Sequence, residues 1–243
     1  MLKFEDFRID CNNKPLFSGL NFAIESKAIT SIVGPSGSGK TTILKSIIRM
    51  LDDQPEFKVS GSIIYDSLSI CDSSLDKYLL RRKIGLVFQK PTIFPGTIYR
   101  NVIFGVNHLK SFNKKVGIQI AEKALREAYL WDEVKDRLFS PAHKLSLGQQ
   151  QRMAIARTLA IGCEVLLMDE PTSSLDVLSS QKIEELMLHL AKEKTVILVT
   201  HNMSQAKKLS NSVILLDSQL KGSGIKILQS KDAIEGLEGH FFE

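Results

Sequence analysis

The stretch SIVGPSGSGKTT (31–42) is the part of the chain whose residue types and spacing most directly suggest chemistry. Gly34, Gly39, Lys40 and Thr41 form the pattern G-x-x-x-x-G-K-T. Glycines let a loop turn its backbone N–H groups inward to phosphate oxygens, and a helix beginning at the lysine adds its positive dipole end. The ammonium can reach outer phosphates and the threonine hydroxyl can ligate Mg²⁺, so the stretch predicts a polyphosphate site. The residues predicted to contact this ligand are Gly34, Pro35, Ser36, Gly37, Ser38, Gly39, Lys40, Thr41 and Thr42.

Two adjacent carboxylates, Asp169 and Glu170, end the apolar run VLLMDE. At the tip of a strand both can approach the phosphate loop, where one can hold Mg²⁺ and the other can polarise an attacking water. Gln89 and His201 likewise follow the apolar runs IGLVF and VILVT. Polar residues directly after buried parallel strands lie on the sheet edge where ligands bind, so we expect these side chains to converge.

The run KLSLGQQQR (144–152) combines a serine, a glycine and the start of a helix. A hydroxyl, a glycine backbone and a helix N-terminus together can bind a second anion. Ser146 or a neighbour can equally be the N-cap of that helix. The residue types leave both interpretations open. The chain has a single glycine loop, so a second anion-binding element would have no nucleotide of its own to bind. It could instead complete the nucleotide site of another copy of the chain.

The elements that must position these residues follow from hydrophobic periodicity. Residues 1–27 read as short strands with a turn at CNNKP, and AITSIVG reads as a buried strand. From Lys40 the period becomes helical, with Lys45 and Arg49 facing away from the apolar stripe. That stripe comprises Ile43, Leu44, Ile47, Ile48 and Leu51.

Strands and helices alternate again after Gln149. The predicted strands in the whole chain include GSIIYD, KIGLVFQ, EVLLMD, TVILVT and SVILLD, and helices are predicted at QQRMAIARTLA and around Ile183, Leu186, Met187 and Leu190. Alternation of this kind predicts a mainly parallel sheet that is covered on both faces. Residues 97–142 are mostly helix-like, with Ile118, Ala121, Leu125 and Ala128 on one stripe, and indicate an inserted helical subdomain.

Composition bounds the compartment and the partners. The 243 residues carry a net charge of +5, which fits a solvated basic surface better than a nucleic-acid or lipid-binding one. The three cysteines lie far apart without a metal-binding pair, which fits a reducing compartment. The N-terminal run MLKFEDFRID has charges where a signal peptide needs an apolar core, and no apolar run approaches the ~20 residues that span a bilayer. Any membrane role therefore requires a partner.

In nearly its whole length the sequence resembles the ATP-binding subunits of ABC transporters. Five motifs occur in the order of that family, and they are GPSGSGKT, Gln89, LSLGQ, LLMDEP followed by SSLD, and His201. The resemblance implies a head-to-tail homodimer that holds two ATP molecules. Each site would combine the glycine loop of one copy with Ser146, Gly148 and Gln149 of the other.

The resemblance also implies a role for each motif residue. Lys40 would bind phosphates and act in catalysis, while Thr41, Gln89 and Asp169 would hold Mg²⁺. Glu170 would be the general base, and His201 would sense the γ-phosphate. Asp176 would cross the dimer interface.

Two positions depart from the pattern of that family. Leu147 replaces the first glycine of the usual LSGGQ, and we expect a working but slower site. Cys11 takes the place of the aromatic residue that stacks on adenine, and Phe7 or Phe17 is the expected substitute.

The fold class expected is therefore α/β, a P-loop NTPase of the ABC type. It would have a mainly parallel core sheet, an N-terminal antiparallel β subdomain and an inserted helical subdomain. The whole chain, 1–243, would be one such domain, with a nucleotide-binding core at 1–89 and 150–243 and the helical subdomain at 90–149.

QKP, FP and IYRNV look most like the phosphate-import ATPases of bacteria. We therefore expect ATP and Mg²⁺ as ligands and transmembrane permease subunits, a second copy and an extracytoplasmic solute-binding protein as partners. The expected location is the cytoplasmic face of the cell membrane. Importers of another oxyanion, a polar amino acid or a metal stay open as alternatives. Three further alternatives stay open, and they are a nucleic-acid-associated ATPase, a small-molecule kinase and a non-hydrolytic switch. We expect no nucleic acid among the partners.

Overall fold

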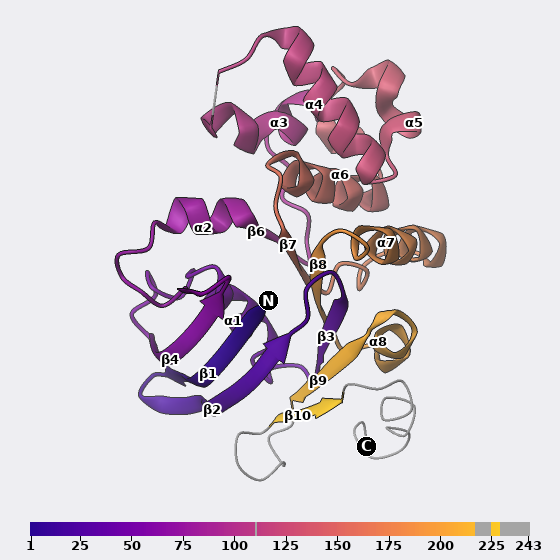
Figure 1. Ribbon diagram of the computed structural model, residues 1–243. Coiled ribbons are helices and arrows are strands. Elements are labelled where there is room, and N and C mark those ends of the chain that lie inside the picture. The colour runs from indigo at the N-terminus through magenta and orange to yellow at the C-terminus, as the bar shows by residue number, and fades with distance from the viewer. Residues whose placement is uncertain (110, 217–224, 229–243) are drawn as a thin grey trace.

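The computed structural model describes residues 1–109, 111–216 and 225–228, which form two β-sheets and the helices around them (Figure 1). One sheet is antiparallel and has the order β2-β1-β4-β5. Its strands are β1 (Leu2–Cys11), β2 (Lys14–Ile24), β4 (Phe57–Tyr65) and β5 (Leu68–Ser69). The N-terminal antiparallel unit is confirmed, but its first strands are not short, because β1 and β2 contain 10 and 11 residues.

The tight turn between β1 and β2 has a local cause. Asn12 and Asn13 both adopt positive φ, 50° and 59°. The type I′ turn of a two-residue hairpin needs such angles at both positions, and asparagine tolerates them better than most residues. The turn predicted at CNNKP is therefore correct.

The second sheet has the order β10-β9-β3-β8-β7-β6. β3 (Ile29–Val33), β6 (Ile84–Val87), β7 (Val165–Asp169), β8 (Thr195–Thr200) and β9 (Ser212–Leu216) run parallel to one another. Within the described residues, β10 (Ile225–Leu228) is the one antiparallel strand of this sheet, and it pairs with β9. The mainly parallel core sheet is thus confirmed. The last residue of the predicted strand SVILLD, Asp217, lies outside the described residues.

Alternate residues of these parallel strands join hydrophobic clusters on opposite faces of the sheet, because successive side chains of a strand point to opposite faces. Leu166 and Met168 join a cluster with the helices α6 (Leu147–Ala160) and α7 (Val177–Leu190). Val165 and Leu167 join a second cluster with the antiparallel sheet and α1 (Lys40–Ile47). The sheet is therefore covered on both faces, as predicted.

Arg49 corrects the expectation that it faces away from the core. The helix α1 ends at Ile47, and Arg49 adopts a φ of 55°, so the chain leaves the helical path before it. Its guanidinium is buried, pairs with Asp52 at 2.8 Å and donates to the carbonyl of Asp72. A helical period continued past the real helix end misplaced this side chain.

The remaining helices complete the layers. α2 (Lys77–Lys83) leads into β6, and α8 (Met203–Leu209) packs beside β3 and β8. The sequence interpretation did not contain α2. No helix in residues 1–109, 111–216 and 225–228 is long and apolar enough to cross a membrane.

Helices α3 (Ile98–Leu109), α4 (Lys114–Glu127) and α5 (Trp131–Val134) gather above α6 in the view of Figure 1. Two short 3₁₀ turns, η1 (Lys135–Arg137) and η2 (Ala142–Lys144), connect α5 to α6. The predicted stripe lies on α4, where Ala121, Leu125 and Ala128 are buried and Ile118 is half-buried. The helix ends after this stripe, because Tyr129 has a φ of 54° between α4 and α5. α6 begins at Leu147 and packs against α3 and α4. The subdomain boundary predicted between residues 149 and 150 therefore falls within this helix. The division into subdomains stays a prediction.

Candidate nucleotide site

Four parallel strands deliver the candidate residues to one edge of the core sheet. β3 ends at Val33, before the glycine loop, and β6 ends at Val87, two residues before Gln89. β7 ends on Asp169, and β8 ends at Thr200, one residue before His201. Because these strands run in the same direction, their carboxyl ends share an edge, which is where α/β proteins bind ligands.

The glycine loop is held in its shape by backbone angles and by close packing. Gly39 has a φ of 89°, and a Cβ at this position would lie 2.7 Å from the ring of Phe17. Lys40 is buried, and its ammonium donates to the carbonyls of Gly34 and Pro35, each at 2.8 Å. Burial lowers the pKa of Lys40, and the nearby carboxylates Glu170 and Asp169 oppose that effect.

Thr41 and Asp169 meet at this edge although 128 positions separate them. The Thr41 hydroxyl lies 3.0 Å from both carboxylate oxygens of Asp169. Burial raises the pKa of Asp169, and the hydrogen bond from Thr41 opposes the rise. A hydroxyl beside a buried carboxylate is a set of hard oxygen atoms that suits Mg²⁺, which keeps most of its ligands as water and phosphate.

The backbone of Glu170 adopts a φ of 45°, and its N–H donates to the carbonyl of Val199 at 2.9 Å. Its Oε2 atom lies 3.0 Å from Nδ1 of His201 and 3.4 Å from Nε2 of Gln89. Nε2 of Gln89 also donates to the hydroxyl of Ser173 at 3.0 Å. The side chains predicted to converge, Gln89, Glu170 and His201, are therefore in contact.

A cavity of about 220 Å³ adjoins this cluster and is lined by Glu170, Thr172, His201 and neighbouring polar residues. Gln205 lies in its wall and donates to Thr172 at 2.9 Å and to Glu184 at 3.0 Å. The sequence analysis included Ser173 in the SSLD motif but predicted no contact for it, and it gave no role to Gln205. Neither follows a strand directly, and no periodicity singles them out.

The serine–glycine element is built as a helix N-terminus. The hydroxyl of Ser146 accepts from the N–H of Gln149 at 3.3 Å, and Oε1 of Gln149 accepts from the N–H of Ser146 at 3.0 Å. This reciprocal pair is a capping box, so the N-cap alternative is confirmed. Gly148 packs on α7, where an added Cβ would lie 2.5 Å from the Ser179 hydroxyl.

These residues contact α5 and α7 rather than the glycine loop of their own chain. Nε2 of Gln149 donates to Glu133 at 2.8 Å. Among the described residues, no hydrogen bond joins Ser146, Gly148 or Gln149 to residues 34–42. The structure therefore brings together Gln89, Asp169, Glu170 and His201, the residues predicted at the strand ends. The serine–glycine element at the start of α6 lies apart from them.

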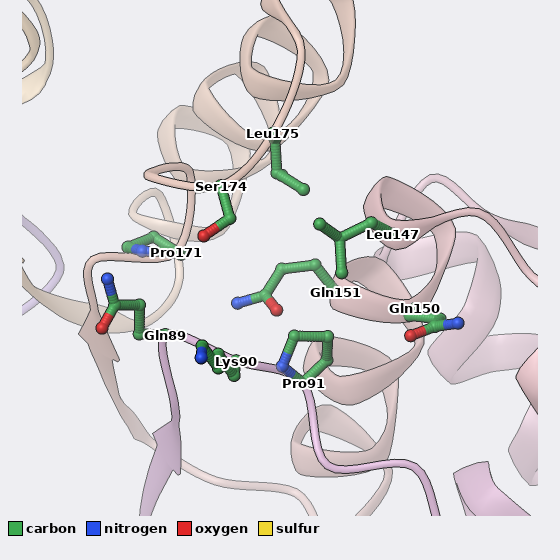
Figure 2. A pocket seen from close by; sticks show the side chains of 9 residues that line it. All are labelled: Gln89, Lys90, Pro91, Leu147, Gln150, Gln151, Pro171, Ser174 and Leu175. Atoms are coloured by element: carbon green, nitrogen blue, oxygen red, sulfur yellow. The ribbon is translucent and has the colours of Figure 1, made fainter.

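Leu147 faces a second cavity, of about 210 Å³, between the residues after β6 and those after β7. Figure 2 shows its side chain pointing toward Leu175, with Pro91 and Pro171 on the other sides. Leu147 retains 43% of its surface exposed. The amide of Gln151 also lies in the wall, and it donates to the carbonyl of Phe88 at 3.0 Å.

The expectation that Phe7 could stack on adenine is wrong. Phe7 has 0% exposure and packs edge-on against Phe4, so its ring is unavailable to a ligand. Phe17 is also buried, at 6%, but its ring lies against the glycine loop. The Cys11 side chain lies at the surface end of β1 and contacts Asn12.

The parallel sheet, the glycine loop ahead of α1 and the acidic pair at the end of β7 together define an α/β nucleotide-binding protein of the P-loop class. Residues 17–173 match the family model described as ABC transporter. The chain belongs to this family.

Curated relatives cover most of the chain. It is 47% identical over 211 residues to "Phosphate import ATP-binding protein PstB 2" of Bacillus subtilis, covering 87% of this chain and 78% of that protein. It is 44% identical to PstB 1 of Streptococcus pneumoniae, with coverages of 90% and 88%. The corresponding Mycoplasma mycoides protein is 50% identical, with coverages of 79% and 83%.

Solved structures share the fold. The cbiO1 protein of Clostridium perfringens, part of the ABC transporter complex cbiONQ, aligns with a TM-score of 0.77 at 29% identity, covering 88% of this chain and 83% of that one. A dimeric ATP-binding cassette in a post-hydrolysis state, bound to ADP and Pi, aligns with a TM-score of 0.73 at 30% identity, with coverages of 89% and 94%.

Proposed function

We propose that this chain is the ATP-hydrolysing subunit of a bacterial phosphate importer. The observation that carries the proposal is the contact of Glu170 with His201 beside the Thr41–Asp169 pair at the end of the glycine loop. Relatives named as phosphate-import ATP-binding proteins, at 44–50% identity, support phosphate as the solute. They do not favour another solute, nucleic-acid association, a kinase or a non-hydrolytic switch.

In the proposed reaction the glycine loop and Lys40 bind the phosphates of ATP. Glu170 takes a proton from water as the water oxygen attacks the γ-phosphorus, and the bond from that phosphorus to the bridging oxygen of ADP breaks. His201 and Gln89 hold the Glu170 carboxylate on its Oε2 side. Positioning and charge stabilisation supply most of the rate in phosphoryl transfer.

Thr41 and Asp169 fit Mg²⁺ by their oxygen donors, and Gln89 is the third proposed ligand. When bound, Mg²⁺ would neutralise charge on the phosphates. No group of three or more His, Cys, Asp or Glu side chains that could hold a metal occurs within the described ranges. Mg²⁺ bound beside a nucleotide needs few protein ligands, because water and phosphate oxygens supply the rest. A site made of Thr41, Asp169 and Gln89 is therefore compatible with Mg²⁺.

A second copy would complete each site with Ser146, Gly148 and Gln149, and Asp176 would lie at the contact between the copies. Within one chain these residues are capped and packed away from the glycine loop, which supports a use on a partner. A related cassette is dimeric in its post-hydrolysis state. Leu147 would then lie beside the phosphates of the partner.

The permease would dock on the proposed helical subdomain, 90–149, and this subunit would lie at the cytoplasmic face of the membrane. α3 exposes Phe104 and Leu109, and the ring of Phe104 lies 4.3 Å from that of Phe94. The Arg157 guanidinium stacks on Phe94 and donates to the carbonyl of Thr92 at 2.8 Å. Contact at α3 would therefore reach both the segment after Gln89 and α6. An extracytoplasmic solute-binding protein would deliver the phosphate.

The test is uptake in cells that lack their own phosphate-import ATPase and express this chain with its permease. We expect ATP-dependent uptake of labelled phosphate, and none with Glu170→Gln. Uptake of labelled sulfate or molybdate without phosphate would reassign the solute. Uptake that persists with Glu170→Gln would remove the assigned base.

A further inference from the structure

The carboxylate of Glu133, in α5, is a junction between three helices. Its Oε1 accepts from Arg152 of α6 at 2.8 Å and from Lys182 of α7 at 3.1 Å. Its Oε2 accepts from Arg152 at 3.0 Å and from Gln149 at 2.8 Å. None of these residues follows a strand, and the site described above gives Glu133 no role.

This junction is built for a permanent charge. The Arg152 side chain is only 4% exposed and also donates to the carbonyl of Tyr129, so its guanidinium is held from two sides. Its hydrogen bonds, with those from Gln149 and Lys182, hold the pKa of Glu133 at about 2. A carboxylate accepts from all these donors at once, whereas an amide would direct its own N–H₂ toward one of them.

The junction lies near the N-terminal end of α6, where Glu133 binds the side-chain nitrogen of Gln149, a residue of the capping box. Oε1 of Gln149 is committed to the N–H of Ser146, and Nε2 is committed to Glu133. Ser146, Gln149 and Glu133 therefore form one chain of hydrogen bonds. Glu133 thus holds the amide nitrogen of the same Gln149 side chain whose oxygen accepts from Ser146.

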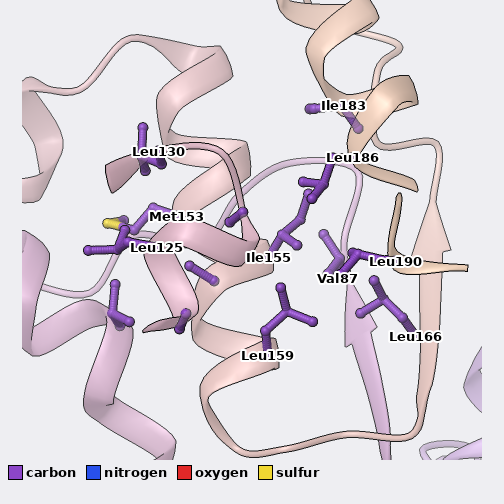
Figure 3. Packing of buried hydrophobic residues seen from close by; sticks show 14 of the residues in the cluster. Val87, Leu125, Leu130, Met153, Ile155, Leu159, Leu166, Ile183, Leu186 and Leu190 are labelled. Carbon is purple, nitrogen blue, oxygen red and sulfur yellow. The ribbon is translucent and has the colours of Figure 1, made fainter. Parts of the chain in front are cut away.

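The same end of α6 is fixed to α7. Gly148 meets Ser179, whose hydroxyl donates to Asp176, the N-cap of α7, at 2.7 Å. Behind this contact, Figure 3 shows Ile155 of α6 next to Leu186 of α7, within the buried cluster that both helices share. The Glu133–Lys182 ion pair joins α5 to the same helix, α7.

We propose that Glu133 is a positioning residue for ATP hydrolysis, which orients Ser146 through Gln149 for the nucleotide held by a second copy. This inference rests on the proposed function, because Ser146 serves a partner only in the dimer. Glu133 would not touch ATP itself. It would act by fixing the N-terminal end of α6, which contacts the ATP held by the second copy. Loss of Glu133 is therefore expected to weaken closure of the dimer on ATP while ATP binding to one chain persists.

The experiment uses the full chain carrying Glu170→Gln, so that ATP is retained. Sedimentation measures the dissociation constant of the ATP-bound dimer, and a fluorescent ATP analogue measures binding to the monomer. Glu133→Gln is expected to raise the dimer constant at least about tenfold, or ~1.4 kcal/mol, with monomer affinity within about twofold. The matched control is Asp132→Asn, which removes a neighbouring carboxylate that is 80% exposed and is expected to change neither constant.

A dimer constant within about twofold of the control overturns the proposal, and so does an equal loss of monomer affinity, which a merely structural role would cause. If Glu133→Gln does not fold, Lys182→Met decides, because Lys182 is 53% exposed and its loss leaves the Glu133–Arg152 pair in place. We expect it to raise the dimer constant about threefold, and an unchanged constant overturns the proposal. If the Glu170→Gln parent itself never dimerises with ATP, the proposed function fails and this inference fails with it.

Discussion

Nδ1 of His201 lies 3.0 Å from Oε2 of Glu170, across the ends of two neighbouring parallel strands. The strand register sets this contact, because Asp169, the last residue of β7, pairs with Val199 of β8. Glu170 and His201 then follow the two strand ends at nearly the same level. A carboxylate placed in this way has one oxygen held by neighbours and can present the other to water.

Replacing Glu170 by Gln should abolish turnover but keep ATP bound. The amide retains the size of the side chain and loses the base, so we expect kcat to fall by about 100-fold or more. Release of inorganic phosphate measures this rate. Glu185→Gln, an exposed carboxylate on α7, is the control and should keep normal activity. Equal rates for Glu170→Gln and this control would contradict the assignment.

Replacing Asp169 by Asn should raise the Mg²⁺ concentration that supports half-maximal hydrolysis. Asn can still accept a hydrogen bond from Thr41, so the fold is kept while the anionic ligand is lost. We expect an increase of about tenfold, and chelation of Mg²⁺ should stop hydrolysis in both proteins. The exposed Asp136→Asn is the control. An unchanged Mg²⁺ requirement would show that Asp169 does not hold the ion.

Glu133 should make folding stability depend on pH in the acid range. Its pKa is lowered to about 2, first by the hydrogen bonds from Arg152 and then by those from Gln149 and Lys182. The stabilisation is therefore complete above the ordinary pKa of about 4.5 and is lost as the pH falls toward 2.

We accordingly expect Glu133→Gln to lower the free energy of unfolding by about 2 kcal/mol at neutral pH, because the buried Arg152 loses its carboxylate partner. The deficit should shrink as the pH falls from about 4.5 to 2. Urea denaturation at a series of pH values measures both quantities, with Asp132→Asn as control. A deficit that does not change with pH would contradict the charge-based explanation.

Leu147→Gly should speed hydrolysis. The leucine is the first residue of α6 and stays 43% exposed beside Ser146, in the place proposed to face the phosphates of a partner. Its removal should raise kcat about threefold and lower stability by roughly 0.5–1 kcal/mol, because glycine is a poor helix former and the contact toward Leu175 is lost.

The control for Leu147 is Leu188→Gly on the exposed side of α7, which should lower stability without raising kcat. Steady-state ATPase rates and thermal melts distinguish the two effects. An equal or slower kcat for Leu147→Gly would show that the leucine does not obstruct the site.

The sequence by itself determined the local parts of the site. The glycine loop, the strand that ends at Asp169 and the strand that ends just before His201 all depend on residues a few positions apart, whose backbone angles and hydrogen bonds are set by their own types. At Ser146 the residue types left a helix cap and an anion site both open, and the structure showed the cap. The parallel sheet followed as well, because alternating strands and helices have few ways to pack.

Only the tertiary structure decided which distant groups meet. Arg49 is buried because α1 ends before it, Phe7 is enclosed by the antiparallel sheet, and Glu133 pairs with Arg152 and Lys182 on separate helices. The positions of such partners depend on where helices end and how they cross. Those features arise from the packing of the whole core, which no local periodicity encodes.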